Sequence, residues 1–430
     1  MKVLVTGANG LIGSAIVGRL VAAGHEVVAA VRVRDSSSRR LPAHRIEAID
    51  MARATRPELW IPHLRGVDAV VNCAGVLQDS PRDSTQAVHQ DGPAALITAC
   101  EQAGVRRFVQ ISALGADRAD GTRFSETKQA GDAALAASTL DWVILRPSVV
   151  LGRAAYGGSA LIRALAALPI LPRQPKAGQL AVIQLDDVTR TVEFFLAAAA
   201  PARLTLELCG PERLSFEEVI AAYRRWLGWP PARLIGLPAW ALAAPFRVGD
   251  WLSMLGWRPP IRTTAQVEIE RGSVGDPEPW IAAVGQRPLS LGQALAREPA
   301  SVQERWFARL YLLKPLVLVV LSGFWIATGL ISLGPAYAAG EAIMSDAGAG
   351  PLAGLATVAG GLADLAIGVA IAFRRTNGLG LVAALGLSVV YLIVATALVP
   401  ELWLDPLGPL VKILPVIGLN LFALAVREDR

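Results

Sequence analysis

Residues 2–20 read KVLVTGANGLIGSAIVGRL and decide the fold of the N-terminal part of the chain. A short run rich in valine, Lys2–Thr6, precedes three spaced glycines and an apolar run typical of a helix. At such a junction Gly7 permits a tight turn, Gly10 lets the backbone approach a pyrophosphate, and Gly13 lets the helix pack closely on the sheet. The start of the helix adds unpaired N–H groups. We expect a dinucleotide to bind at Gly7, Ala8, Asn9, Gly10, Leu11, Ile12 and Gly13.

Short β-branched runs alternate with amphipathic helices up to about residue 210. This order is typical of βαβ units around a parallel sheet. Two expected helices, Leu11–Ala23 and Ala94–Ala103, end before the glycines at positions 24 and 104. The expected strands are Lys2–Thr6, Glu26–Val31, Ile46–Ile49, Ala69–Asn72, Arg107–Ser112, Trp142–Arg146 and Thr205–Leu208. The pattern predicts an α/β fold, a Rossmann-type doubly wound parallel sheet, in a first domain over residues 1–230.

The residue after the second expected strand bears on the choice of nucleotide. Proteins that prefer NAD carry an acidic residue there for the ribose 2′-hydroxyl, whereas this chain has Arg32. Its guanidinium would pair with a 2′-phosphate, and Arg34 is a second cation nearby. Solvation alone also explains an arginine at a strand end. We expect NADP(H) to be preferred over NAD(H).

Apolar residues concentrate after about residue 310. Of the 430 residues, 53% are hydrophobic and 18% are charged. Four segments approach the length of about 20 residues that crosses a bilayer, at about 311–333, 352–373, 379–399 and 407–426. Basic residues flank them on one side, namely Arg305, Arg309, Lys314, Arg374, Arg375, Arg427 and Arg430, and the other two loops carry Glu341, Asp346, Glu401 and Asp405. The positive-inside rule then predicts a multi-pass protein of the bacterial inner membrane with both termini cytoplasmic.

Residues 231–305 differ from the segments on either side, because prolines and tryptophans accumulate there. The apolar stretch Leu234–Trp257 is interrupted by Pro238, Pro245, Arg247 and Asp250, so it does not qualify as a membrane span. Three interpretations stay open: a helix at the membrane surface, a cover over a ligand cleft, or ordinary packing of a helical cap.

Cysteine spacing and charge exclude several kinds of site. Cys73, Cys100 and Cys209 are far apart without a CxxC pair, which predicts neither a disulfide framework nor a metal site. The formal charge of +5 is modest, and Lys and Arg are dispersed. We therefore expect no binding of nucleic acid.

Several motifs together resemble the extended and atypical short-chain dehydrogenase/reductase superfamily over about residues 1–300. They are the TGxxGxxG loop, Asp50, the turn Asn72-Cys-Ala-Gly75 and the segment LRPSVVLG that begins at residue 145. Within the superfamily the chain is similar to the NmrA-like group and to the nucleotide-binding accessory subunit of respiratory complex I. The resemblance implies that Asp50 and Met51 flank the adenine, that Ala74 and Gly75 pass under the cofactor, and that Pro147 and Val149 line the nicotinamide side.

The resemblance also implies a catalytic set, in which a Tyr-x-x-x-Lys pair on one helix face works with a serine after the fifth strand. Ser112 and Lys128 match this pattern, and Lys128 would hold the nicotinamide ribose. Phe124 stands at the tyrosine position and has no proton to give. Either Tyr156 or Ser125 supplies the proton, or the chemistry needs no acid, or the domain binds nucleotide without turning it over.

Asp364 lies in the middle of the second predicted membrane segment, and Asn420 lies in the fourth. An ionisable group at such depth is costly unless paired, and it marks a candidate functional site. The alternative is a protonated Asp364 that is hydrogen-bonded to Asn420, Thr396 or Tyr391. Residues 306–430 resemble the DoxX-like family, whose relatives are associated with quinone-linked redox proteins.

These observations predict an NADP(H)-binding short-chain dehydrogenase/reductase-like protein anchored in the lipid bilayer. It would act on, or sense redox state for, an apolar substrate such as a quinone or an isoprenoid. A second hypothesis is a non-catalytic, nucleotide-bound scaffold or assembly factor for a respiratory membrane complex, and Phe124 favours it. A third is a transporter-like helical unit regulated by the nucleotide domain.

Overall fold

The computed structural model describes residues 1–80, 83–118, 122–257 and 259–427. The chain divides into two compact units. The first comprises Met1–Asp250 and Pro259–Ala308, and the second comprises Trp251–Arg258 and Arg309–Arg430. The stretch between residues 231 and 305 thus belongs largely to the same unit as the sheet.

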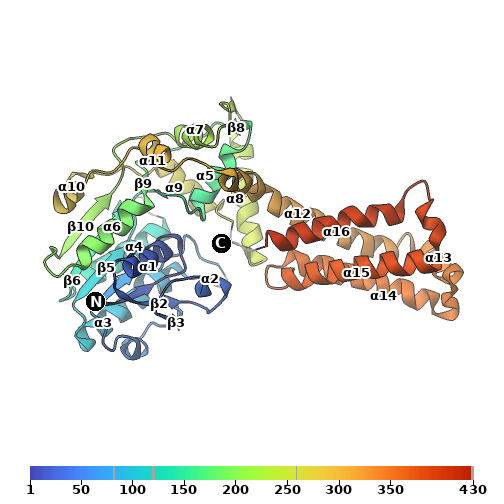
Figure 1. Cartoon of the computed structure of the whole chain (residues 1–430), viewed down its shortest axis with the longest axis horizontal. Helices are drawn as coiled ribbons and strands as arrows, with labels where there is room; N and C mark the ends of the chain where they lie inside the picture. The colour runs from blue at the N-terminus through green and yellow to red at the C-terminus, as the bar shows by residue number, and fades with distance from the viewer. Residues whose placement is uncertain (81–82, 119–121, 258, 428–430) are drawn as a thin grey trace. The chain divides into compact units, whose positions relative to one another are not determined.

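The first unit is built on a seven-stranded sheet of the order β10-β6-β5-β4-β1-β2-β3, whose neighbouring strands run parallel (Figure 1). Its strands are β1 (Lys2–Thr6), β2 (Glu26–Val31), β3 (Arg45–Ala48), β4 (Ala69–Asn72), β5 (Arg107–Ile111), β6 (Asp141–Pro147) and β10 (Leu204–Leu208). This is the doubly wound order, with a seventh strand beside β6, and it confirms the predicted fold class. The order reverses between β1 and β4, so a ligand crevice is expected at their carboxyl ends.

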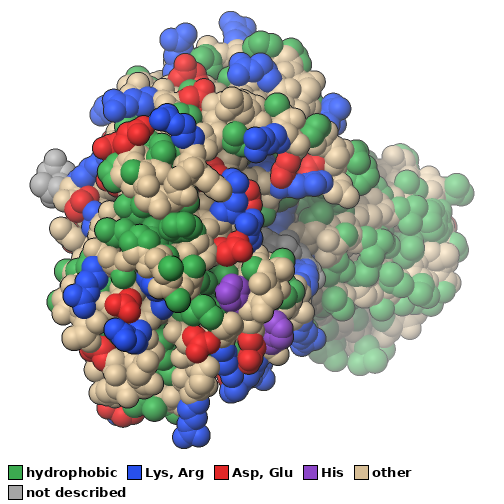
Figure 2. Space-filling view, turned by 60° about the vertical axis from the view of Figure 1, so that its left-hand side comes forward, with side chains coloured by type: hydrophobic (Ala, Val, Ile, Leu, Met, Phe, Trp, Pro, Cys, Tyr) green, Lys and Arg blue, Asp and Glu red, His purple; other side chains and the backbone are tan. Residues whose placement is uncertain are grey.

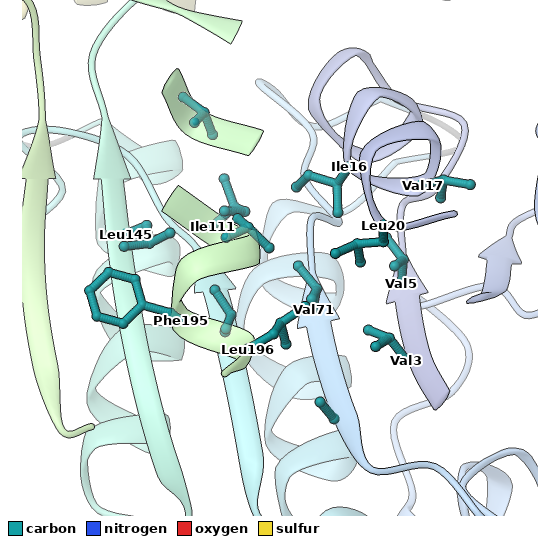
Figure 3. Packing of buried hydrophobic residues seen from close by; sticks show 14 of the residues in the cluster. Val3, Val5, Ile16, Val17, Leu20, Val71, Ile111, Leu145, Phe195 and Leu196 are labelled. Carbon is teal, nitrogen blue, oxygen red and sulfur yellow. The ribbon is translucent and has the colours of Figure 1, made fainter. Parts of the chain in front are cut away.

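Helices cover both faces of the sheet. On one face lie α1 (Leu11–Ala22) and α6 (Leu185–Leu196), and on the other lie α3 (Gly92–Ala103) and α4 (Arg123–Ala136). Successive side chains of β1 point to opposite faces of the sheet. Val3 and Val5 pack in the core on the side of α1 (Figure 3), and Leu4 packs in the core on the side of α3. A strand that is buried on both faces consists of a continuous apolar run. Such runs are visible in the sequence, so the positions of these strands could be predicted.

Smaller elements complete this unit. The connections of the N-terminal half contain α2 (Ser36–Arg39), short 3₁₀ turns at Pro57–Leu59 and Ile61–His63, and a π-helical turn at Ala87–Asp91. The strands β7 (Val150–Leu151) and β9 (Ile183–Gln184) form one pair, and β8 (Ile170–Pro172) and β11 (Arg233–Ile235) form another. The remaining helices are α5 (Gly158–Ala166), α7 (Phe216–Trp226), α8 (Ala239–Met254), α9 (Thr263–Arg271), α10 (Glu278–Val284) and α11 (Leu291–Arg297).

The tryptophans of the Trp- and Pro-rich segment have different environments. Trp280 of α10 is 2% exposed, packs in the core beneath α6, and donates its indole N–H to the Thr191 hydroxyl at 3.0 Å. Trp240 and Trp251 of α8 are mostly exposed. Part of the segment is therefore core of the sheet unit, and part is surface.

The second unit is helical. It contains α12 (Val302–Leu333), whose first turns belong to the sheet unit, followed by α13 (Tyr337–Met344), α14 (Ala353–Ala372), α15 (Asn377–Leu398) and α16 (Pro409–Ala425), with turns at Ser345–Ala349, Gly350–Leu352 and Pro400–Trp403. Within the described ranges, three helical stretches are long and apolar enough to cross a membrane: Val302–Leu333, Tyr337–Ala372 and Asn377–Leu398. The fourth predicted span corresponds to α16, an apolar helix of 17 residues that is shorter than the others.

The surface of the helical unit is apolar. Leucines and valines such as Leu355, Leu379 and Val319 are more than 60% exposed, and Figure 2 shows few charged side chains on its visible face. A surface of this kind is stable only in contact with an apolar solvent. Together with the length of its helices, this marks the unit as membrane-associated.

Small residues let the helices of this unit approach closely. A Cβ at Gly329 of α12 would lie 2.7 Å from the carbonyl oxygen of Gly361, and a Cβ at Gly380 would lie 2.8 Å from the backbone nitrogen of Ile371. Such contacts are typical of membrane helix pairs.

The polar residues inside the bundle are partly paired. The Tyr391 hydroxyl donates to the Asp364 carboxylate at 3.0 Å, so one of the three expected partners of Asp364 is present. Asn420 donates instead to the carbonyl of Val416, and Thr396 donates to that of Leu392. Within the described chain the Asn420 side-chain oxygen is buried without a partner.

Candidate nucleotide-binding site

The glycine loop packs against the end of β4. Gly7 has a φ of +60°, and a Cβ there would lie 2.7 Å from the Cys73 carbonyl oxygen. A Cβ at Gly13 would overlap the carbonyl oxygen of Gly7. Gly10 is extended, precedes α1, and donates its N–H to Gly7 at 2.9 Å. No side chain of the described residues caps α1, so its first turn can receive an anion.

The other loop residues surround this helix start. Ala8 is fully buried and donates its N–H to Ala30 of β2, and Ile12 packs against the sheet core. The Asn9 amide lies 3.4 Å from the Ser37 hydroxyl of α2, which connects the loop with the end of β2. Leu11 opens α1. A side chain at Gly7 or Gly13 would collide with the backbone of this loop. Because these positions are glycines, the backbone can approach a phosphate closely, and the loop fits a bound dinucleotide.

Arg32 lies between two carboxylates. Its guanidinium is 2.8 Å from Asp83 and 3.6 Å from Asp50, while Arg34 donates to the carbonyl of Ile46. Asp50 also accepts from the N–H of Ala52. The part of the chain that was predicted to bind the adenosine therefore holds both a cation and carboxylates. Asp83 was not among the predicted residues, and nothing in the spacing from Arg32 indicates it.

Met51 follows β3, and Ala74 and Gly75 follow β4. Met51 is nearly buried, and a Cβ at Gly92 would lie 2.5 Å from its carbonyl oxygen. The N–H of Ala74 lies 3.2 Å from the side-chain oxygen of Asn72, whose amide donates to Gln110 at 2.8 Å. A side chain at Gly75 would lie 3.5 Å from the Lys128 amine. The structure thus brings Gly75 and Lys128 together.

Ser112 directly follows β5, and Lys128 lies on α4, so the strand and the helix hold these two residues as predicted. The Lys128 amine donates to the Ile111 carbonyl at 3.0 Å, and the Ser112 hydroxyl donates to Asp132 at 2.8 Å. Arg146 donates to the same carboxylate oxygen at 3.2 Å. Asp132 was not among the predicted residues, although it follows Lys128 by one helical turn and so lies on the same helix face.

Burial changes the acidity of this cluster. It lowers the pKa of Lys128, and the Asp132 charge partly opposes this change. It raises the pKa of Asp132, while the Ser112 hydrogen bond and the Arg146 charge act in the opposite direction. A buried carboxyl of raised pKa next to a hydroxyl can exchange a proton with it.

Phe124 packs against a histidine that the sequence analysis also missed. The rings of Phe124 and His89 meet edge to face with centroids 5.4 Å apart. His89 Nε2 accepts the N–H of Val76 at 3.0 Å, so Nδ1 carries the proton toward the Thr127 hydroxyl at 2.9 Å. Burial, reinforced by the Lys128 charge, lowers the pKa of His89 to about 2. His89 is therefore neutral and holds the chain that follows Gly75.

The remaining predicted residues lie on other segments. Pro147 ends β6, and Val149 accepts the N–H of Ile183 at its carbonyl. Tyr156 is 37% exposed in the loop between β7 and α5, and its backbone N–H bonds to Ser159. Ser125 is buried and accepts from Arg271 at 2.9 Å. The hydrogen bonds of Ser112 and Lys128 go to Asp132 and Ile111, not to Tyr156 or Ser125.

The glycine cradle leads to a first prediction. Gly13→Ala should weaken binding of NADPH by at least about tenfold, or 1.4 kcal/mol, because the added Cβ overlaps the Gly7 carbonyl. Gly18→Ala in the same helix is the matched control, since nothing lies within 4 Å of its added carbon. Isothermal titration with the two variants measures the difference. Equal affinities would contradict the placement of the pyrophosphate at this loop.

His89 leads to a prediction about pH. Between pH 6.5 and about 2 the unfolded chain binds a proton at this residue and the folded chain does not. The free energy of unfolding should therefore fall as pH falls below 6.5, by up to about 1.4 kcal/mol per pH unit from this residue. His89→Gln removes that part of the slope, and His63→Gln retains it. Urea titrations of the detergent-solubilised protein at several pH values measure the slopes, and equal slopes for all three proteins would refute the assignment.

Comparisons with known proteins identify the families to which the two parts of the chain are similar. A family model described as NAD(P)H-binding matches residues 7–163, and the model of the DoxX-like family matches residues 322–421. The 3-diazoavenalumate denitrifying reductase of a Streptomyces species is 30% identical over 311 residues, which are 64% of this chain and 93% of that protein. The photosystem II assembly factor Ycf39 of Synechocystis is 28% identical over 53% of this chain and 68% of its own length.

Longer relatives and solved structures complete the comparison. The chain spans 23% of the length of uncharacterised mycobacterial relatives with which it is 29% identical. The structure of MoeE5 with UDP-glucuronic acid and NAD superposes with a TM-score of 0.52, at 21% identity, over 69% of this chain and 97% of that one, which shows the shared fold. The chain therefore belongs to the NAD(P)H-binding short-chain dehydrogenase/reductase family and carries a DoxX-like domain after its nucleotide-binding domain.

Proposed function

We propose that this chain is a membrane-bound, NADPH-dependent reductase that acts on an apolar substrate at the bilayer, such as a quinone or an isoprenoid. The observation that carries the proposal is the hydrogen bond of 2.8 Å between Ser112 and Asp132 beside Lys128. It supplies a hydroxyl with a carboxyl partner in a site where Phe124 replaces the phenol. The joining of this site to an apolar helical unit supports an apolar substrate.

The residues of the site would divide the work as follows. Bound reduced nicotinamide supplies a hydride. Ser112 gives its proton to the substrate oxygen as the carbonyl carbon is reduced, and Asp132 in its protonated form returns a proton to Ser112. The raised pKa of Asp132 favours that form. Lys128 lies beside Gly75 and would hold the nicotinamide ribose.

A second function is a nucleotide-bound redox sensor, scaffold or assembly factor for a membrane complex. Phe124 favours it, because a site without the phenol retains the glycine cradle and Lys128 while losing its usual acid. The similarity to an assembly factor of photosystem II also supports it. The two functions differ in whether bound NADPH is consumed.

The preference for NADP(H) is part of the proposal, and Arg32 supports it. Its guanidinium is held by Asp83, which is nearly buried, and by Asp50. The carboxylates lie near its Nε and one terminal nitrogen, and a guanidinium has five N–H donors, so others are left for a 2′-phosphate.

The proposed location is the inner membrane of a bacterium, with both chain termini in the cytoplasm. The Lys314 amine donates to the Arg427 carbonyl at 3.0 Å, so α12 enters and α16 leaves the bundle at the same end. Arg374 and Arg375 follow α14. The opposite end carries Glu341, Asp346, Glu401 and Asp405, with Lys412 as its basic residue, and Arg430 lies outside the described residues. This asymmetry supports a cytoplasmic basic end.

The catalytic proposal is tested by turnover of NADPH with short-chain quinones in detergent. Asp132→Asn should lower the rate by about 10² or more while the affinity for NADPH stays unchanged, because the proton source is lost. Asp117→Asn is the matched control, since Asp117 also pairs with Arg146 but not with Ser112. Phe124→Tyr should raise the rate. Bound NADPH that neither the wild type nor Phe124→Tyr oxidises would favour the sensor or scaffold.

The cofactor preference is tested by binding of NADPH and NADH to Arg32→Ala. We expect the affinity for NADPH to fall by about tenfold or more, and that for NADH to change much less, because the 2′-phosphate is absent from NADH. Arg34→Ala is a control for nearby positive charge. An equal loss for both nucleotides would mean that Arg32 only holds Asp50 and Asp83 in place.

A further inference from the structure

The end of α8 and the residues that follow it belong to the helical unit and contact one end of its helices. The indole N–H of Trp257 donates to the carbonyl of Ala372 at 2.8 Å, and the N–H of Arg374 donates to the carbonyl of Leu255 at 3.3 Å. The Trp257 ring also packs on the core that contains Trp325. We call residues 251–257 the collar segment.

This attachment places the collar segment at a boundary of the membrane. Ala372 is the last residue of α14, and its carbonyl is one that a helix leaves without an internal partner. The 20 residues of α14 span about 30 Å, which matches the hydrocarbon thickness of a bilayer. The end of α14 is therefore the level at which headgroups begin.

The collar segment is apolar on the side that the protein does not cover. Trp251 is 59% exposed and Met254 is 72% exposed, and the neighbouring Phe373 is also exposed. Tryptophan at the level of the headgroups is typical of membrane proteins, because its ring combines an apolar body with a polar N–H.

Positive charge accumulates at the same end. Arg374 and Arg375 follow the carbonyl that Trp257 binds, and Lys314 and Arg427 meet through a hydrogen bond where the first helix enters and the last one leaves. Basic residues beside a membrane helix attract anionic phospholipids. An exposed apolar segment next to a cluster of cations matches an anionic leaflet in both polarity and charge.

We propose that the collar segment inserts into the headgroup region of an anionic lipid leaflet, with Trp251 and Met254 reaching the acyl chains and Arg375 binding lipid phosphate. Of the three interpretations of the stretch 234–257, this selects the membrane surface for its C-terminal part. The inference requires only the helical unit and its membrane. It stands whether or not the nucleotide site is catalytic.

The test uses the full chain in nanodiscs, with a fluorophore on Met254→Cys. The native thiols interfere little, because burial raises the pKa of Cys73 and Cys100 to about 12 and that of Cys209 to about 11. Lipids brominated near the headgroup should quench the probe at 254 at least about twofold more than a probe on Leu59→Cys, an exposed position of the sheet unit. A probe on Val319→Cys in α12 reports the acyl region.

Lipid charge provides the second measurement. Quenching at 254 should be stronger in nanodiscs that contain phosphatidylglycerol than in those of phosphatidylcholine alone, and Arg375→Gln should reduce that difference. Quenching at 254 equal to that at Leu59 would overturn the proposal, as would cross-linking of the labelled position to another protein in native membranes without any lipid quenching. Quenching that is equally strong in both kinds of nanodisc would overturn the proposal that the collar segment prefers anionic lipid.

Discussion

The backbone of Gly7 leaves no room for a side chain at position 13, and this close contact positions the rest of the site. It holds the start of α1 against the ends of β1 and β4, where the strand order of the sheet reverses. The same turn lies against Cys73, so the chain that follows β4 passes directly beside the loop. The same chain brings Gly75 next to the amine of Lys128.

The phenylalanine at position 124 affects the surroundings of the site as well as its supply of protons. Phe124 packs on a neutral His89, which in turn holds the chain after Gly75, so this part of the site is apolar and rigid. The ionisable groups lie on the other side, where Lys128, Asp132 and Ser112 approach one another. A site arranged in this way keeps the glycine loop and Lys128, and a carboxyl and a hydroxyl are hydrogen-bonded beside them.

Local patterns predicted the strands and the glycine loop because both depend on neighbours in sequence. The seven sheet strands differ from their expected bounds by one residue at most at either end. In the central strands β1 and β4 burial on both faces demands continuous apolar runs, whereas the edge strands β3 and β10 alternate buried and more exposed residues. Asp83 is 51 residues from Arg32, so no local pattern connects them. Asp132 follows Lys128 by one helical turn, so its place on the same helix face was predictable. It was not predicted as a site residue, because a carboxylate in an amphipathic helix usually faces solvent. The different environments of Trp280 and Trp251 depend on tertiary packing, which their shared composition cannot reveal.

The position of Trp280 also bears on how the chain is made. Its indole fills the core beneath α6 and bonds to Thr191, so a chain that ends near residue 230 leaves the apolar surface of α6 open to water. During synthesis this part of the core is completed only after α10 has left the ribosome, and α12 begins at Val302, shortly afterwards. Completion of the nucleotide-binding domain and entry of the first apolar helix into the membrane thus fall in the same interval of translation.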